Sequence, residues 1–116
     1  MSEWKKHPNN PVLGPGYCIK AVFDCCVIPQ PDTLRMWFSW RDLRSIAYTQ
    51  SQDGANWQCP HIVLEVAPDI EWEKAKINRP SVLQVRDKWY MWYTGQNRDT
   101  YVSAIGLAVS DDSETC

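Results

Sequence analysis

The chain has 116 residues, with 12 Lys and Arg against 14 Asp and Glu and a formal net charge of −2. This length suits a single domain with a real core, and the near balance of charge without a basic run argues against nucleic acid or a membrane surface as a partner. The N-terminus has no apolar signal region, and no apolar run approaches the roughly 20 residues that cross a bilayer. We therefore expect a cytoplasmic protein.

The composition favours an all-β fold. Seven Trp and five Tyr accompany eight Pro, and turn residues interrupt the chain every 8 to 12 residues or so, a spacing typical of short strands. The five cysteines are odd in number and follow no signal peptide, and the chain has neither a C-x-x-C pair nor suitably spaced histidines. We expect free or buried thiols, no disulfide framework, no metal and no cofactor.

The expected strands form two copies of one repeat. They cover 24–29, 34–40, 45–51 and 61–66 in the first copy, and 79–85, 89–95 and 103–110 in the second. The Met-Trp-aromatic string at 36–38 returns at 91–93 after 55 residues, and Ile46 returns as Ile105 after 59. A period of this size, with short strands inside it, is typical of β-propeller blades.

The second copy ends without a counterpart of the strand over 61–66, whereas the N-terminal segment 4–13 matches residues 57–64. The sequence therefore predicts one unit over 1–116, made of two four-stranded antiparallel β-propeller blades in permuted strand order (D-A-B-C-D-A-B-C). The parts of this unit are a spare outer strand over 4–13, a first blade over 24–66, and a second blade over 79–112 that lacks its outer strand.

Two blades cannot close a ring, and they leave open strand edges that invite pairing with another chain. We expect identical chains to close the ring head to tail, with segment 4–13 completing the second blade of a neighbour. Three copies would give six blades and are favoured over two copies, which would give four. The alternative is that the chain is the front part of a longer propeller.

Four strings carry a resemblance to a known family: Trp-x-x-His-Pro-x-Asn-Pro-Val-Leu over 4–13, Arg-Pro-Ser-Val-Leu over 79–83, Trp-Tyr-Met-Trp-Tyr-Thr-Gly over 89–95 and Ile-Gly-Leu-Ala-Val-Ser-Asp-Asp over 105–112. They resemble the five-bladed propeller glycosidases of families 43, 32 and 130. The resemblance implies catalytic carboxylates at the axial ends of the innermost strands, so Asp24 is similar to the first catalytic Asp, a base or nucleophile. The matching position 55 residues later holds Arg79, where many relatives carry a second acid, and the general-acid Glu of a third blade has no counterpart.

The same resemblance implies that the start of each innermost strand and the loop between the second and third strands face the ligand. The residues expected at this end, besides Asp24, are Trp40, Arg41, Asp42, Arg44, Asn78, Arg79, Arg98, Asp99 and Tyr101. Aromatic rings stack on sugars and arginine forks bind carboxylate or sulfate, so we expect a carbohydrate ligand, with an anionic one favoured. The alternative is that the arginines pair with Asp24, Asp42 and Asp99. Glu71 or Glu73, in the acidic segment that follows the first copy, could also reach this end.

These patterns predict a glycosidase-like propeller protein that acts on or binds carbohydrate. One plausible carboxylate does not make the flanking pair that glycoside hydrolysis needs, so catalysis stays open. The alternatives are a non-catalytic, lectin-like ring of identical chains and an inactive fragment of a longer glycosidase.

Overall fold

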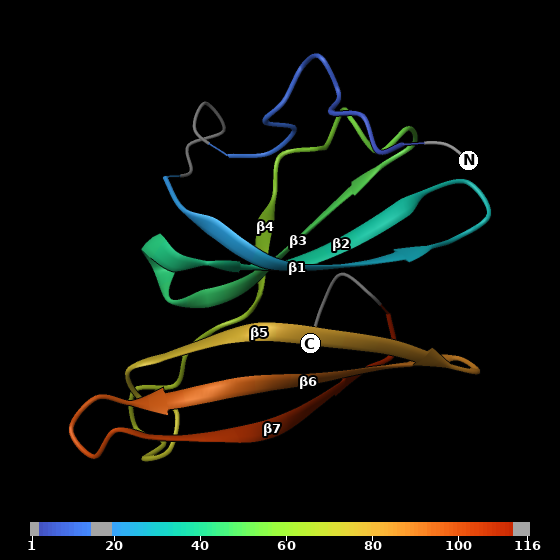
Figure 1. Ribbon diagram of the computed structural model, residues 1–116. Helices are drawn as coiled ribbons and strands as arrows, with labels where there is room; N and C mark the ends of the chain where they lie inside the picture. The colour runs from blue at the N-terminus through green and yellow to red at the C-terminus, as the bar shows by residue number, and fades with distance from the viewer. Residues whose placement is uncertain (1–2, 15–19, 113–116) are drawn as a thin grey trace.

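The computed structural model describes residues 3–14 and 20–112, which form two antiparallel β-sheets (Figure 1). Sheet 1 has four strands in the order β1-β2-β3-β4: β1 Val22–Pro29, β2 Leu34–Trp40, β3 Ser45–Ser51 and β4 His61–Leu64. Sheet 2 has three in the order β5-β6-β7: β5 Lys76–Val85, β6 Lys88–Asn97 and β7 Val102–Ser110. A single 3-10 turn, η1 Arg41–Leu43, follows β2.

The all-β prediction is therefore confirmed, and β2 and β3 have the predicted bounds. Every side chain of these two strands is buried or half-buried, because both faces of sheet 1 are covered, and η1 followed by Arg44 connects them. In the described residues, no helix is long and apolar enough to cross a membrane. The free cysteines include Cys25, Cys26 and Cys59, whereas Cys18 and Cys116 lie outside the described residues.

Residues 4–13 differ from the prediction, because they do not form a strand, and the described residues form seven strands instead of eight. A turn at Pro8 and Asn9 interrupts the segment, where the backbone N–H groups of Asn9 and Asn10 donate to the Nδ1 and carbonyl oxygen of His7. Prolines that lack an N–H weaken strand pairing further. The permuted order D-A-B-C-D-A-B-C is thus not seen, and the pairing of this segment with another copy stays a prediction.

The main core lies between the two sheets. Trp37 and Tyr48 of sheet 1 meet edge to face with ring centroids 5.3 Å apart, and Trp37 lies 5.5 Å from Trp89 of sheet 2. Because side chains alternate along a strand, each sheet has an inner face toward this core and an outer face away from it. The inner faces are represented by Trp37, Ile46 and Tyr48 in sheet 1 and by Val82, Met91 and Tyr93 in sheet 2.

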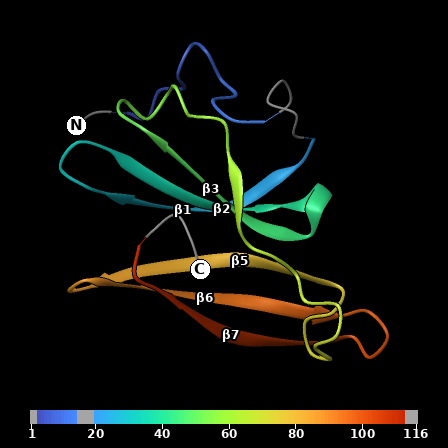
Figure 2. The same cartoon turned by 180° about the vertical axis from the view of Figure 1, so that it is seen from behind.

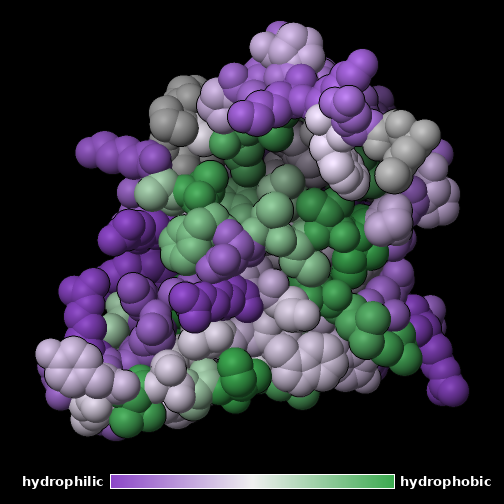
Figure 3. Space-filling model, viewed as in Figure 1, coloured by the Kyte–Doolittle hydropathy of each residue, from purple (hydrophilic) through white to green (hydrophobic). Residues whose placement is uncertain are grey.

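The two outer faces differ in their cover. A second core on the outer face of sheet 1 contains Met36, Phe38, Ala47 and Trp57, and Val12 and Leu13 pack against it. Both ribbon views place the N-terminal segment on this side of sheet 1, away from sheet 2 (Figure 2). The outer face of sheet 2 exposes apolar side chains, and apolar surface is visible over both sheets in Figure 3.

Candidate functional site

Two matching β-bulges place the first pair of predicted site residues. The register of β1 against β2 shifts between Phe23 and Cys26, and that of β5 against β6 shifts between Asn78 and Ser81. Asp24 and Arg79 lie in these bulges with φ of 53° and 56°, in the left-handed region that residues other than glycine rarely adopt. Bulges and left-handed residues re-aim side chains and are frequent next to functional sites.

The two bulges bring Asp24 and Arg79 together. Arg79 Nε lies 3.4 Å from Asp24 Oδ2, with 64% of the Arg79 side chain and 43% of the Asp24 side chain exposed. The backbone N–H of Arg79 donates to Ser39 Oγ at 2.7 Å, which ties this bulge to sheet 1. So exposed an ion pair contributes little to folding stability, and its groups stay accessible to a ligand.

Trp40 and Asp42 hold the chain entering β1. Asp42 Oδ2 accepts hydrogen bonds from the backbone N–H of Lys20 at 2.8 Å and from Trp40 Nε1 at 3.3 Å. The hydrogen bond from Lys20 in particular keeps the pKa of Asp42 below its usual value. The Trp40 ring packs against the outer-face core of sheet 1, 6.4 Å from the Phe38 ring. The Trp40 and Asp42 side chains therefore make contacts within the fold, whereas the Arg41 side chain is exposed.

Arg44 joins the two sheets at this same end. It ends η1 in the left-handed conformation, with φ of 54°. Its carbonyl oxygen accepts the backbone N–H of Ile77 at 3.1 Å, and its Nη1 donates to the carbonyl of Ala75 at 3.4 Å. The loop after β2 therefore lies against the start of β5.

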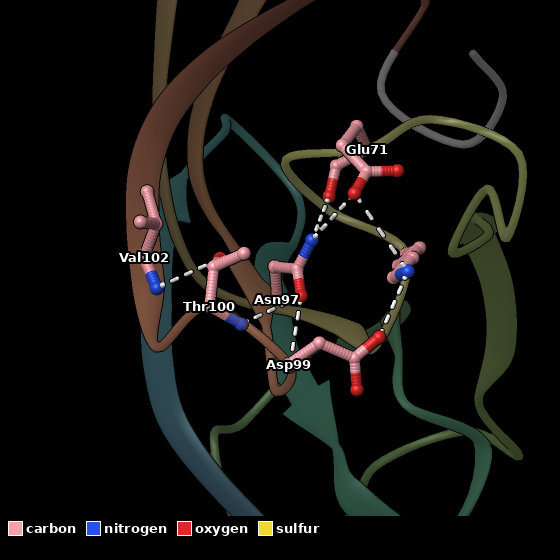
Figure 4. A network of polar contacts seen from close by, with 6 residues as sticks. Glu71, Asn97, Asp99, Thr100 and Val102 are labelled. Atoms are coloured by element: carbon pink, nitrogen blue, oxygen red, sulfur yellow. Dashed lines mark hydrogen bonds and ion pairs between the residues drawn. The ribbon is translucent and has the colours of Figure 1, made fainter.

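Asp99 belongs to a polar network that fixes the loop between β6 and β7 (Figure 4). Asn97 Nδ2 donates to the carbonyl of Glu71 at 2.6 Å, and Asn97 Oδ1 accepts the backbone N–H of Asp99 at 2.9 Å. Lys74 pairs with Asp99 at 3.0 Å and with Glu71 at 3.8 Å. The hydrogen bond to Asp99 and the two negative charges raise the pKa of Lys74. Lys74 was not among the predicted site residues, because its partner lies across a loop and the sequence gives no local sign of the pairing.

Two cavities lie around this network. One of about 240 Å³ is lined by Arg44, Pro68, Lys74, Ala75, Arg98 and Asp99. Another of about 180 Å³ has Lys76, Gln96, Arg98 and Tyr101 in its wall. Arg98 contributes to both and is exposed, and the part of the chain that the structure describes gives it no ion pair.

Asn78 is buried beside the Arg79 bulge. Its Nδ2 donates to Gln96 Oε1 at 3.0 Å. Its Oδ1 is buried and accepts no hydrogen bond from the described residues. A buried amide oxygen without a donor is costly, but Asn78 is not accessible to a ligand in this conformation.

Glu73 is a buried structural carboxylate. Tyr93 Oη donates to its Oε1 at 2.9 Å, and the backbone N–H of Ala67 donates to its Oε2 at 3.1 Å. Its charge is thus satisfied inside the fold, while Glu71 takes part in the loop network. The partner that the structure gives Asp24 is an arginine and not a second carboxyl group.

The predicted site residues therefore fall into three groups at one end of the two sheets. Asp24 and Arg79 form an exposed pair, with Asn78 buried next to it in sequence. Arg44, Arg98 and Asp99 line one cavity, with Tyr101 beside Arg98 in the next. Trp40, Arg41 and Asp42 surround the start of β1.

Comparison with solved structures identifies the fold. A glycoside hydrolase matches with a TM-score of 0.74 and 20% identity over 97% of this chain and 34% of its own. A glycosyl hydrolase from Bacteroides ovatus matches with a TM-score of 0.71 and 18% identity over 95% of this chain and 39% of its own. An exo-β-1,3-galactanase from Clostridium thermocellum matches with a TM-score of 0.64 and 21% identity over 77% of this chain and 21% of its own.

A structure from the GH130 family of mannoside phosphorylases and glycoside hydrolases also matches, with a TM-score of 0.71 and 14% identity over 97% of this chain and 40% of its own. No family model and no curated protein sequence matches the chain. The chain spans about a third of the length of the first solved structures it matches. The two sheets of this chain thus have the fold of part of the solved glycoside hydrolases that they match.

Proposed function

We propose that the chain binds carbohydrate at the end where Asp24 and Arg79 meet, without hydrolysing it by itself. The Asp24–Arg79 pair carries this proposal. A carboxylate and a guanidinium side by side supply an acceptor and several donors, which suits neighbouring sugar hydroxyl groups. Hydrolysis needs two carboxyl groups about 5–10 Å apart on either side of the bond, and an arginine stands where the repeat would supply the second.

The charges around the neighbouring cavity favour an acidic sugar. Arg44, Lys74 and Arg98 line this cavity, with Asp99 as the opposing charge. Lys74 is already paired with Asp99 and Glu71, which leaves the two arginines in excess. Arginine forks bind carboxylates through two parallel hydrogen bonds, so a uronic acid is the ligand that this end of the molecule suits best.

Isothermal titration with an oligosaccharide of uronic acids, and with its neutral counterpart of equal length, tests the proposal. We expect the acidic oligosaccharide to bind at least about tenfold more tightly, which is about 1.4 kcal/mol. Arg98→Gln should remove most of this preference, and Asp24→Asn or Arg79→Gln should weaken both ligands. Equal affinities would overturn the acidic preference, and no binding of either ligand would overturn the carbohydrate proposal.

Arg86 provides a matched control for Arg79. It is an exposed arginine with φ of 57°, close to the 56° of Arg79, but it lies in the β5–β6 turn at the opposite end of sheet 2. Arg86→Gln should therefore perturb the backbone equally and leave the affinity unchanged. If Arg86→Gln and Arg79→Gln weaken binding equally, the ligand does not contact the Asp24–Arg79 pair.

The fold supports glycoside hydrolysis as a second candidate, with Asp24 as base or nucleophile. Release of a chromophore from aryl glycosides measures it directly. Turnover that is lost in Asp24→Asn and retained in Asp32→Asn, a change in a distant turn, would establish hydrolysis in place of simple binding.

A further inference from the structure

The outer face of sheet 2 is an apolar surface that the described residues leave exposed. It is formed by Leu83, Val85, Tyr90, Trp92, Ile105, Leu107 and Val109, which the register of β5, β6 and β7 places on one side. Six of these seven are large hydrophobic side chains more than a third exposed. Apolar surface of this kind, gathered on one face of a sheet, marks an interaction site in a soluble protein.

The internal repeat indicates what this face is built to contact. Trp92 and Ile105 correspond to Trp37 and Ile46, at offsets of 55 and 59 residues. Trp37 is 2% exposed and Ile46 is 0% exposed on the inner face of sheet 1, whereas Trp92 is 39% and Ile105 68% exposed. The outer face of sheet 2 thus repeats the surface with which sheet 1 packs onto sheet 2.

The complementary surface is present elsewhere in the same chain. Sheet 1 packs onto the inner face of sheet 2, which includes Val82, and the counterpart of Val82 in the repeat is Val27. Val82 is 8% exposed and Val27 is 42% exposed. Beside Val27, Val22 and Met36 line an apolar cavity of about 200 Å³ on the outer face of sheet 1. The outer face of sheet 1 is therefore the partly open counterpart of the inner face of sheet 2.

The N-terminal segment marks where a partner sheet would lie. Val12 and Leu13 correspond in the sequence pattern to Val63 and Leu64 of β4. Val63 and Leu64 pack against the core between the sheets, and Val12 and Leu13 pack in the same way against the outer face of sheet 1. Relative to the outer face of sheet 1, the segment thus lies where β4 lies relative to sheet 2, which is the place of the fourth strand of a further sheet. The other three strands of that sheet would cover the open apolar surface beside the segment.

We propose that a second copy of this chain supplies those three strands. The outer face of its sheet 2 docks on the outer face of sheet 1, and the open edge of its β7 lies beside segment 4–13. The contact is head to tail, because each copy offers one surface and receives the other, so repetition closes a ring or grows a filament. We expect a closed ring, and a trimer is favoured because three copies give the common ring size of six blades.

Light scattering on a sizing column, over a wide range of concentration, tests the docking. The wild-type chain should elute as a closed oligomer of discrete mass. Ile105→Glu places a charge on the donor surface and Val27→Glu places one on the receiving surface, and each should convert the chain to smaller species. Ile70→Glu, at an exposed apolar residue of the crossover between the sheets, is the matched control and should leave the mass unchanged.

Mixing the two variants separates this arrangement from others. Each retains one intact surface, so a mixture of Ile105→Glu and Val27→Glu should form a one-to-one heterodimer that neither variant forms alone. A symmetric contact between two outer faces of sheet 2 would leave Val27→Glu dimeric and give no heterodimer, which overturns the proposal. A wild-type chain that is monomeric at all concentrations also overturns it and points to a different protein as the partner. Near-UV circular dichroism of each variant verifies that the intersheet core is intact.

Discussion

The equivalent faces of the two sheets are covered by different parts of the chain. The outer face of sheet 1 is covered by Val12 and Leu13 and by its own Trp40. At the positions of Trp40 and Ala47, sheet 2 has Gly95 and Gly106, and Trp72 from the crossover lies over both glycines. The Trp72 ring stacks on Tyr93 with centroids 5.8 Å apart. Sheet 1 thus supplies an indole from its own strand, whereas sheet 2 receives one from the crossover. Sheet 2 has glycines at these two positions because the Trp72 ring occupies the space of the missing side chains.

The largest expected effect separates the buried tryptophan of sheet 1 from its counterpart in sheet 2. Trp37→Ala removes a fully buried ring and should lower the free energy of unfolding by about 3–5 kcal/mol. Trp92→Ala removes a partly exposed ring and should cost less than about 1 kcal/mol at concentrations where the chain is monomeric. Urea unfolding of both variants measures the difference, and equal losses would show that burial does not distinguish the two copies.

Removal of the phenol that binds Glu73 should have a smaller effect. Tyr93→Phe leaves the buried Glu73 carboxylate without one of its two hydrogen-bond donors, so we expect a loss of about 1–3 kcal/mol in the free energy of unfolding. Sheet 1 has Phe38 at the matching position. If adding Glu73→Gln to Tyr93→Phe restores most of the lost free energy of unfolding, the carboxylate left without its donor caused the loss. If the double variant is as unstable as Tyr93→Phe alone, the carboxylate did not cause it.

A methyl group at Gly95 tests the close approach of Trp72. A Cβ there would lie 2.5 Å from Trp72 Cζ3 and 2.6 Å from Glu73 Cβ, so the crossover must move. Gly95→Ala should cost about 1–3 kcal/mol of unfolding free energy, as overpacking does. Thr94→Ala, at the next residue and on the opposite face, is the control. The near-UV dichroism of Gly95→Ala should change together with its stability.

The smallest expected effect concerns the turn after β3 and depends on pH. The backbone N–H of Asn56, the side-chain amide of Asn56 and the backbone N–H of Ala55 donate to Asp53 and lower its pKa well below the ordinary value of 3.8. The folded state thus favours the charged form, and this contribution is complete above the ordinary pKa and is lost as the pH falls through the folded pKa. Asp53→Asn should flatten the acid limb of stability against pH, whereas Asp32→Asn, in the β1–β2 turn, should keep the wild-type curve.

The turn that follows β7 begins in the same way as the turn after β3. The backbone N–H of Asp112 donates to Ser110 Oγ at 3.3 Å, as that of Asp53 donates to Ser51 Oγ at 3.2 Å. An acid limb that persists in Asp53→Asn would indicate that a carboxylate elsewhere, and not this turn, controls the acid stability.

The sequence predicted the parts of the fold that depend on local composition and on the repeat. β2 and β3 were predictable because each is a short run rich in aromatic or β-branched residues between turn residues. The repeat also placed Asp24 and Arg79 at equivalent positions before their ion pair was seen. The conformation of 4–13 was not predictable, since a strand forms only beside an available edge. Neither were the pairing of Lys74 with Asp99 and the packing of Trp40, because both depend on how the crossover and the chain before β1 lie against the sheets.

The contact of Trp37 with Trp89 and Tyr48 has a practical consequence. Two indoles and a phenol held at fixed angles in the seam between the sheets form a chromophore cluster whose ultraviolet ellipticity depends on the separation of the sheets. Loss of this near-UV signal with retained far-UV ellipticity would show that the two sheets separate before their strands unfold. The chain therefore contains an intrinsic spectroscopic probe of sheet docking, which needs no attached dye.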